Sequence, residues 1–154
     1  MSKSEPILNG MSVAYTHFKD IQKQLSYINQ KYMSLNWRDL SKEIFVHKFT
    51  RMLTEIWKVH PFREGNTRTV SAFGFLFLKQ YGYSYNAELI KKHAKYFRNA
   101  LVMASLNEYA EYDYIDNIMK DAISNINSKD STNKYQRIKN YNIENYEYSY
   151  HEVK

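Results

Sequence analysis

Residues 60–68 read His60-Pro61-Phe62-Arg63-Glu64-Gly65-Asn66-Thr67-Arg68 and separate two strongly periodic segments. The segment before them opens at Ser41 and repeats apolar side chains at three- and four-residue steps, which predicts a helix. That helix must end before Pro61, because the residue preceding a proline is pushed out of the helical region. The segment after Gly65 predicts a helix to about Tyr81. It is apolar nearly all round, so we expect it at the centre of a bundle.

Outside this pair the same periodicity predicts three more helices. They cover residues 15–32, 86–104 and 112–123, the second of them capped by Asn86. Residues 1–13 have no helical period and favour a short strand or hairpin. The fold class is therefore all-α, a helical bundle with a β-like N-terminal edge. We expect a core at 1–126, with the hairpin at 1–14, a polar linker at 127–134 and a tyrosine-rich segment at 135–154.

The composition fits one globular domain. The 154 residues are 44% hydrophobic and 25% charged, which excludes a disordered tail, and 4 Gly with 2 Pro favour long helices over a β-sandwich. The absence of cysteine excludes disulfides and thiolate chemistry and fits a reducing compartment. No apolar run is long enough to cross a membrane and no signal peptide is present. We therefore expect a cytoplasmic protein without a membrane partner.

The net charge of +6 raises the question of nucleic-acid binding. However, the basic residues are scattered along the chain, and Lys91-Lys92 is the single adjacent pair. A nucleic-acid surface would cluster them. A solvated surface is the better interpretation, and a nucleic-acid-binding helical bundle rests on charge alone.

The loop at 60–68 combines residue types suited to phosphate chemistry. A loop that feeds a helix N-terminus collects anions, because backbone N–H groups and the helix dipole point outward. Gly65 allows close approach of a phosphate, and the side-chain amide of Asn66 is an additional donor. Glu64 could hold Mg²⁺, Arg68 could neutralise phosphate charge, and His60 is a titratable base. The alternative is a polar helix–loop–helix connection in which His60 caps a helix.

The combined string resembles the signature of the Fic family, HxFx(D/E)GNGRxxR. The matching residues are His60, Phe62, Glu64, Gly65, Asn66 and Arg68. Residues 2–10 are similar to the family's flap, a β-hairpin that docks the target segment beside the nucleotide. The resemblance covers most of the chain, from the flap through the helices after the motif, although relatives normally carry helices before the flap. A fragment, a short protein and half of an assembly all remain open.

The resemblance implies a protein adenylyltransferase, which transfers AMP from ATP to a hydroxyl side chain of a target protein with Mg²⁺. By position, His60 would deprotonate the hydroxyl, Glu64 would hold Mg²⁺ and Phe62 would anchor the loop in the core. The phosphate-binding set would be Gly65, Asn66, Thr67 and Arg68. The residues that dock the target on the flap would be Ile7, Leu8, Asn9 and Gly10.

Two positions depart from the family pattern. Thr67 replaces the second glycine and places a β-branched side chain beside the phosphate loop, while Ser71 replaces the second arginine. We therefore expect weaker or altered nucleotide binding, and a different donor stays open.

The C-terminal segment resembles the inhibitory helix of one Fic class, (S/T)xxxE(G/N). Glu144 with the Asn after it matches, and Asn140 stands at the Ser or Thr position. The resemblance implies that Glu144 intrudes on the phosphate site. Its usual partner there is the second arginine, which is Ser71 in this chain, so either the contact is weaker or another cation, such as Arg68, receives Glu144. A polar tail without this role is the alternative. Candidate self-modification sites are Tyr141, Tyr146, Tyr148 and Tyr150.

Two other functions compete with the adenylyltransferase. One is a catalytically degenerate Fic-fold module that regulates a partner through the flap edge, and the other is a transferase that uses another nucleotide donor. For the adenylyltransferase, the expected partner is a protein target with a hydroxyl side chain. Relatives with the C-terminal helix suggest a type II topoisomerase, and a homo-oligomer is a further expectation.

Overall fold

The computed structural model describes residues 1–8, 10–125 and 141–143. The helices are α1 (Ile21–Met33), α2 (Lys42–Val59), α3 (Asn66–Gln80), α4 (Ala87–Lys92), α5 (Ala94–Ala104) and α6 (Asp113–Ala122). The strands are β1 (Ser2–Ser4), β2 (Ser12–Ala14), β3 (Tyr83–Tyr85) and β4 (Ile123–Asn125). The structure is a helical bundle with a small N-terminal hairpin, so the predicted fold class is confirmed.

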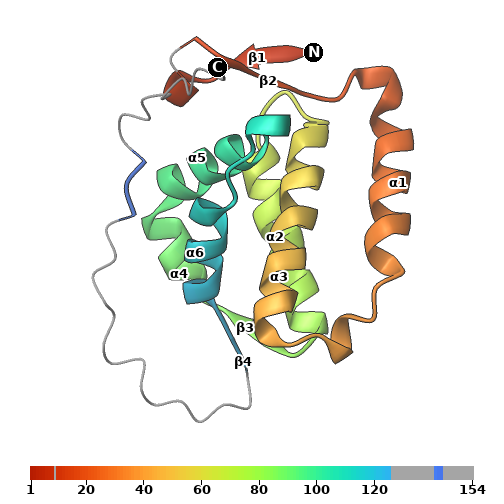
Figure 1. Cartoon of the computed structure of the whole chain (residues 1–154), viewed down its shortest axis with the longest axis vertical. Helices are drawn as coiled ribbons and strands as arrows, with labels where there is room; N and C mark the ends of the chain where they lie inside the picture. The colour runs from red at the N-terminus through yellow and green to blue at the C-terminus, as the bar shows by residue number, and fades with distance from the viewer. Residues whose placement is uncertain (9, 126–140, 144–154) are drawn as a thin grey trace, which may run out of the picture.

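Helix α2 forms the centre of the bundle, with α1 on one side and α4, α5 and α6 on the other (Figure 1). Ser41 caps it by accepting a hydrogen bond from the Ile44 N–H, as the sequence predicts. Its inward side chains are fully buried: Phe45, Phe49, Met52, Leu53 and Trp57. The prediction that α3 would be central is wrong, because Phe75 is 42% and Leu76 64% exposed. Helix α3 buries only the stripe that faces its neighbours.

Helices α2 and α3 approach closely at Gly74. A Cβ added there would lie 3.2 Å from both Leu53 Cδ2 and Phe49 Cζ. These contacts are tighter than ordinary van der Waals distances, so the absence of a side chain at this position lets the two helices meet. The loop at 60–65 joins the same two helices, and its ends are therefore held by a packed interface.

Three local features differ from the sequence-based expectations. The first helix begins only at Ile21, after a 3₁₀ turn at Phe18–Asp20, and Phe18 is exposed rather than packed. The helix expected over 86–104 breaks at His93, which ends α4 and begins α5. Strands β3 and β4 pair antiparallel, with Ser84 opposite Ser124, where no strands were expected.

The N-terminal hairpin forms with a different internal structure from the expected one. Strands β1 and β2 pair antiparallel, with Lys3 opposite Val13. The Ile7–Leu8 pair, expected in a strand, lies instead in a 3₁₀ turn that begins at Pro6, where the proline ring fixes a helical φ. Leu8 is buried in the core and fastens the turn to the bundle.

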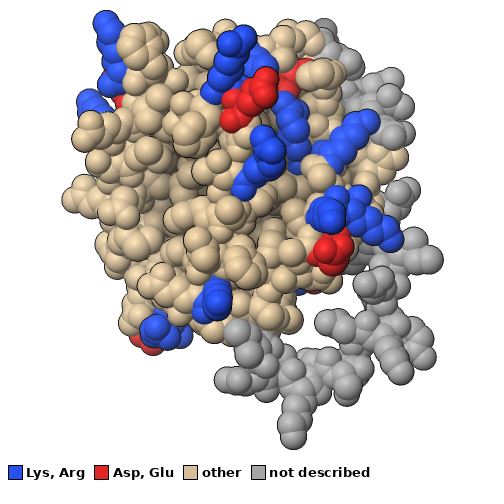
Figure 2. Space-filling model, turned by 180° about the vertical axis from the view of Figure 1, so that it is seen from behind, with Lys and Arg blue, Asp and Glu red and all other residues tan. Residues whose placement is uncertain are grey.

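The surface separates charge from apolar area. Lysine and arginine side chains, scattered in the sequence, gather on one part of the back face, while much of that face is uncharged (Figure 2). Nδ1 of the exposed His47 lies 3.8 Å from Oδ2 of Asp116. Among the helices of the described residues, none has the length and apolar character of a membrane span.

Candidate active site

Two residues in the left-handed region bracket the loop between α2 and α3. His60 has φ 52° and ends α2, its N–H bonding the Trp57 carbonyl, while Gly65 has φ 85° and precedes α3. Histidine is enriched in this region compared with most residues, and glycine enters it without steric cost. The backbone therefore reverses at both ends of the loop and brings His60 beside the start of α3.

Asn66 braces this loop from inside. Its Oδ1 accepts a hydrogen bond from the Phe62 N–H at 3.1 Å, and its Nδ2 donates to the Phe62 carbonyl at 2.7 Å. The side chain thus fixes the loop, whereas the sequence suggested an amide aimed at phosphate. The expectation that Phe62 points into the core is wrong: its side chain is 51% exposed. The loop is anchored by the two Asn66 bonds to its backbone, so it does not need an apolar anchor there.

The N-terminus of α3 is open to an anion. No side chain of the described residues caps it, and the first helical bond runs from the Thr69 N–H to the Gly65 carbonyl. The earlier N–H groups of the helix therefore have no partner within the helix and point outward. A Cβ on Gly65 would lie 3.4 Å from Arg68 Nη2, so the guanidinium lies over the same end of the helix. Positive charge and free donors converge there.

Glu64 is the carboxylate of this loop. It is exposed, and no described side chain forms an ion pair with it. No group of three or more potential metal ligands occurs among the described residues. One free carboxylate suits Mg²⁺ that takes its other ligands from phosphates and water, and it does not suit a metal site built from protein alone.

The imidazole of His60 packs against two aromatic rings. Its centroid is 4.0 Å from that of Tyr15, at an interplanar angle of 33°, and 5.6 Å from that of Trp57, which is edge-on. Burial lowers the pKa of His60 below its ordinary value, the charge of Lys3 adds to this, and Glu5 opposes it. The ring is therefore neutral near pH 7, the form that accepts a proton.

Thr67 and Ser71, the two departures from the motif, turn toward protein groups. Thr67 Oγ1 accepts a hydrogen bond from the Trp57 indole N–H at 3.0 Å. Ser71 Oγ donates to the Thr67 carbonyl at 2.9 Å, one turn back along α3. The Thr67 hydroxyl thus joins the last turn of α2 to the first turn of α3.

Comparisons with known proteins agree with this geometry. The family model of the Fic/DOC family matches residues 3–78. The chain belongs to the Fic/DOC family. A search of curated proteins finds no match.

Solved Fic structures from Bartonella share the fold. BepC of Bartonella tribocorum, solved with bound AMPPNP, gives a TM-score of 0.67 at 18% identity, covering 80% of this chain and 56% of that one. The N-terminal Fic domain of a putative cell filamentation protein of Bartonella quintana gives a TM-score of 0.64 at 24% identity, covering 76% of this chain and 52% of that one. The N-terminal Fic domain of Bep8 of Bartonella sp. 1-1C gives a TM-score of 0.65 at 23% identity, covering 79% of this chain and 54% of that one. The chain thus spans just over half the length of these Fic proteins.

Beside the Fic motif a pocket of about 390 Å³ opens between α3 and the α4–α5 pair. Arg68 and Lys91 are its cationic lining residues. Its other lining residues are Thr67, Ser71, Ala72, Phe75, Tyr85, Ala87, Ile90, Ala94 and Phe97. A largely apolar floor with positive charge on two walls can take an organic anion.

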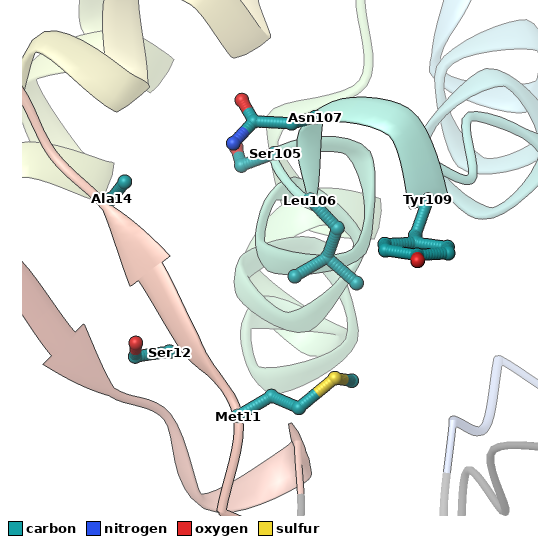
Figure 3. A pocket seen from close by; sticks show the side chains of 7 residues that line it. All are labelled: Met11, Ser12, Ala14, Ser105, Leu106, Asn107 and Tyr109. Atoms are coloured by element: carbon teal, nitrogen blue, oxygen red, sulfur yellow. The ribbon is translucent and has the colours of Figure 1, made fainter.

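Within residues 1–8, 10–125 and 141–143, the flap has an unpaired strand edge. Tyr15 and Met1 exchange two backbone hydrogen bonds, so by antiparallel alternation the N–H and C=O groups of Ser12 and Ala14 point away from β1. This edge borders a pocket of about 110 Å³ (Figure 3). Met11 and Leu106 point toward each other across it. Leu8, expected at the target-docking edge, is buried, and the outward edge of the hairpin lies at Ser12–Ala14; Asn9 lies outside the described residues.

Sequence reasoning missed the buried residues that tie the flap to the core. Glu5 is 1% exposed, accepts a hydrogen bond from the Tyr15 hydroxyl and pairs with Arg98. Glu5 and Arg98 are 93 residues apart, and no local pattern links them. The one available signal was a glutamate next to a proline in the segment similar to the Fic flap.

Part of the C-terminal segment returns to the core. The Tyr141 hydroxyl donates to Asp121, and its ring lies 4.7 Å from His93 and 5.0 Å from Tyr96 between centroids. Ile143 is buried in the core cluster. The predicted residues Asn140, Glu144, Tyr146, Tyr148 and Tyr150 lie outside the described residues, as does the linker at 127–134.

Proposed function

We propose that this protein is a Fic-type adenylyltransferase that moves AMP from ATP to a hydroxyl side chain of a target protein. One observation carries the proposal: a neutral, half-buried His60 lies at one end of a braced loop, and the open N-terminus of α3 lies at the other. A base and an anion site at this spacing suit attack of a hydroxyl on a phosphate. Membership of the Fic family and the AMPPNP-bound BepC neighbour support a nucleotide as the ligand.

In this reaction the target hydroxyl oxygen attacks the α-phosphorus of ATP. The bond from phosphorus to the bridging oxygen breaks, pyrophosphate leaves, and His60 takes the hydroxyl proton. Nδ1 of His60 is buried, which leaves Nε2 as the proton acceptor. The outward N–H groups of α3 and the Arg68 guanidinium stabilise the charge on the phosphates.

Glu64 would hold Mg²⁺ at this site, where the cation would neutralise phosphate charge. Its exposure and its lack of a described ion-pair partner favour that role. The ATP-binding residues are Gly65, Asn66, Thr67 and Arg68. Asn66 acts by shaping the loop, and Thr67 contributes its backbone N–H, because its hydroxyl bonds the Trp57 indole.

The target segment docks as an added strand on the outward edge of β2. The Thr16 N–H, next along that edge, bonds the carbonyl of Lys58, two residues before His60. A segment paired with Ser12 and Ala14 is thereby directed toward the end of α2. The partner is therefore a protein with an extended, hydroxyl-bearing segment; a type II topoisomerase is one such candidate, and the location is cytoplasmic.

The C-terminal segment regulates the enzyme through Glu144, with Asn140 four residues before it in the sequence. The contacts of Tyr141 and Ile143 with the core support docking of this segment on the bundle. A carboxylate near the α3 N-terminus competes with phosphate for the same donors and repels the nucleotide. Arg68 is the cation nearest that site in the motif, since Ser71 replaces the second arginine.

Intact-mass spectrometry after incubation with ATP and Mg²⁺ tests the proposal. The chain, Glu144→Gly, and Glu144→Gly with His60→Asn are compared; asparagine also tolerates the left-handed backbone at position 60, so the control removes the base without straining the loop. We expect one AMP adduct with Glu144→Gly and none with the double variant. No adduct on the chain or on added protein targets refutes AMP transfer, and an adduct only with another nucleotide assigns a different donor.

A further inference from the structure

The orientation of the His60 ring is not set by a hydrogen bond to a described side chain. Nδ1 is buried without a partner of normal distance and angle among the residues that the structure describes. A general base must nevertheless hold its accepting nitrogen within hydrogen-bond reach of the reacting group. The two aromatic rings packed against His60, together with a backbone interaction with Trp57 that raises the pKa of the imidazole, are the contacts that can fix its plane.

Tyr15 is held in place from the flap. Its hydroxyl donates to Glu5 Oε1 at 2.8 Å, and Glu5 Oε2 accepts from Arg98 Nη2 at 2.6 Å. Glu5 is 1% exposed, so rotation of the Tyr15 ring would remove a hydrogen bond from a buried carboxylate. The ring that covers His60 is therefore anchored to both the flap and α5.

Trp57 is held in place from the phosphate loop. It is 1% exposed and packs edge-on against both Tyr15 and His60, at centroid distances of 5.6 Å. Its indole N–H donates to Thr67 Oγ1. The glycine of the usual Fic motif has no acceptor at position 67, so this bond is a feature of this chain.

We propose that Tyr15 and Trp57 are positioning residues that clamp the imidazole of His60, and that the Thr67 hydroxyl anchors the clamp to the phosphate loop. This inference rests on the proposed function, since it assigns the ring a productive orientation. The two anchors come from elements that the substrates touch: the flap that docks the target and the helix end that holds the phosphates. Where the motif glycine would leave the backbone freer, Thr67 thus forms a hydrogen bond that links the helix end carrying His60 to the N-terminus of α3.

The structural arm of the test uses the two indole N–H signals in nitrogen–proton NMR spectra. Trp37 donates to the Tyr32 carbonyl and provides an internal reference. We expect Thr67→Val to move the Trp57 indole signal upfield and to shift the ring protons of His60, while Trp37 stays in place. Thr67→Ser keeps the acceptor and should restore both signals. An unchanged Trp57 signal in Thr67→Val overturns the anchor.

The kinetic arm separates positioning from binding. Displacing a catalytic group by a fraction of an ångström lowers the rate while leaving ground-state contacts intact. We expect Thr67→Val and Tyr15→Leu to lower kcat about tenfold with the KM for ATP unchanged, and Thr67→Ser to recover kcat. A rise in KM at constant kcat, or normal kcat in both variants, overturns the clamp.

The two arms distinguish this inference from the proposed function. If the unaltered chain transfers no nucleotide while the NMR shifts occur as expected, the transfer reaction fails and the anchored ring geometry stands. If transfer occurs and the spectra do not respond, the clamp fails and the reaction stands. Melting curves identify a variant that fails to fold. If Tyr15→Leu fails, Tyr15→Phe, which removes only the hydroxyl, replaces it in the kinetic arm.

Discussion

Gly65→Ala offers the sharpest separation of loop geometry from general stability. Gly65 has φ 85°, where an L-residue costs about 1–2 kcal/mol because its Cβ crowds the carbonyl oxygen. For a chain of this size, that cost lowers the Tm by about 2–8 °C. The added Cβ would also come into van der Waals contact with Arg68 Nη2 at 3.4 Å, so relief of the backbone strain shifts either the loop or the guanidinium beside it.

The same substitution should weaken nucleotide binding. Either response to the strain moves a group that faces the phosphates: the backbone N–H groups of α3, or the Arg68 side chain. Losing one charge-assisted hydrogen bond costs about 1.5–3 kcal/mol, which corresponds to an affinity loss of about 10- to 150-fold. Titration calorimetry with a non-hydrolysable ATP analogue and Mg²⁺ measures it.

Gly82→Ala is the matched control. Gly82 has φ 77° at the far end of α3, and a Cβ there meets nothing within 4 Å. It carries the same backbone strain, so its Tm should fall by a similar amount while nucleotide affinity stays at the level of the unaltered chain. Equal affinity losses in the two variants, or normal affinity in Gly65→Ala, would refute the assignment of Gly65 to the phosphate site.

Three further outcomes are expected. The activity, measured as kcat/KM, should rise with pH as His60 loses its proton, because only the neutral ring can accept a proton from the target hydroxyl. Burial and the charge of Lys3 lower the pKa of His60, so the midpoint of this rise should lie below about 6.5. A midpoint above 6.5 contradicts this. Gly74→Val should overpack the α2–α3 contact and lower unfolding free energy by about 1–3 kcal/mol, and an unchanged urea midpoint would be inconsistent with the 3.2 Å distances. Asn66→Ala should release the loop and cost about 1–3 kcal/mol, with faster proteolysis between α2 and α3 as the sign that distinguishes it from Gly74→Val.

The central helices could be predicted because their signals are local. Ser41 caps α2, Pro61 limits its end, and Gly82 follows α3, so both boundaries follow from residue-level sterics and capping. The short pair of β3 and β4 could not be predicted in this way. Each strand has three residues, and the pairing joins Tyr83 with Asn125 across 42 positions, so it depends on the packed bundle rather than on propensity.

The apolar content of α3 misled the prediction of its place in the bundle. A helix with apolar residues on several faces reads as central, yet Phe75 and Leu76 are exposed among the described residues. Composition cannot tell a buried face from one that borders a pocket, and Phe75 lines the pocket of about 390 Å³. The side chains that line a pocket and those that pack in a core share the same apolar character.

At the site, sequence identified the reactive groups but not what holds them. His60, Glu64 and Arg68 stand out because their chemistry is unusual for a loop, whereas Tyr15 and Glu5 are ordinary until folding places them beside His60. The Thr67 substitution illustrates the same limit. From the sequence, the change from the motif glycine to Thr67 predicted weaker nucleotide binding. Only the folded chain shows that the Thr67 hydroxyl accepts a hydrogen bond from the Trp57 indole. A motif residue must therefore be judged with its tertiary partner, and in this chain that partner lies ten residues earlier, on the helix that carries the base.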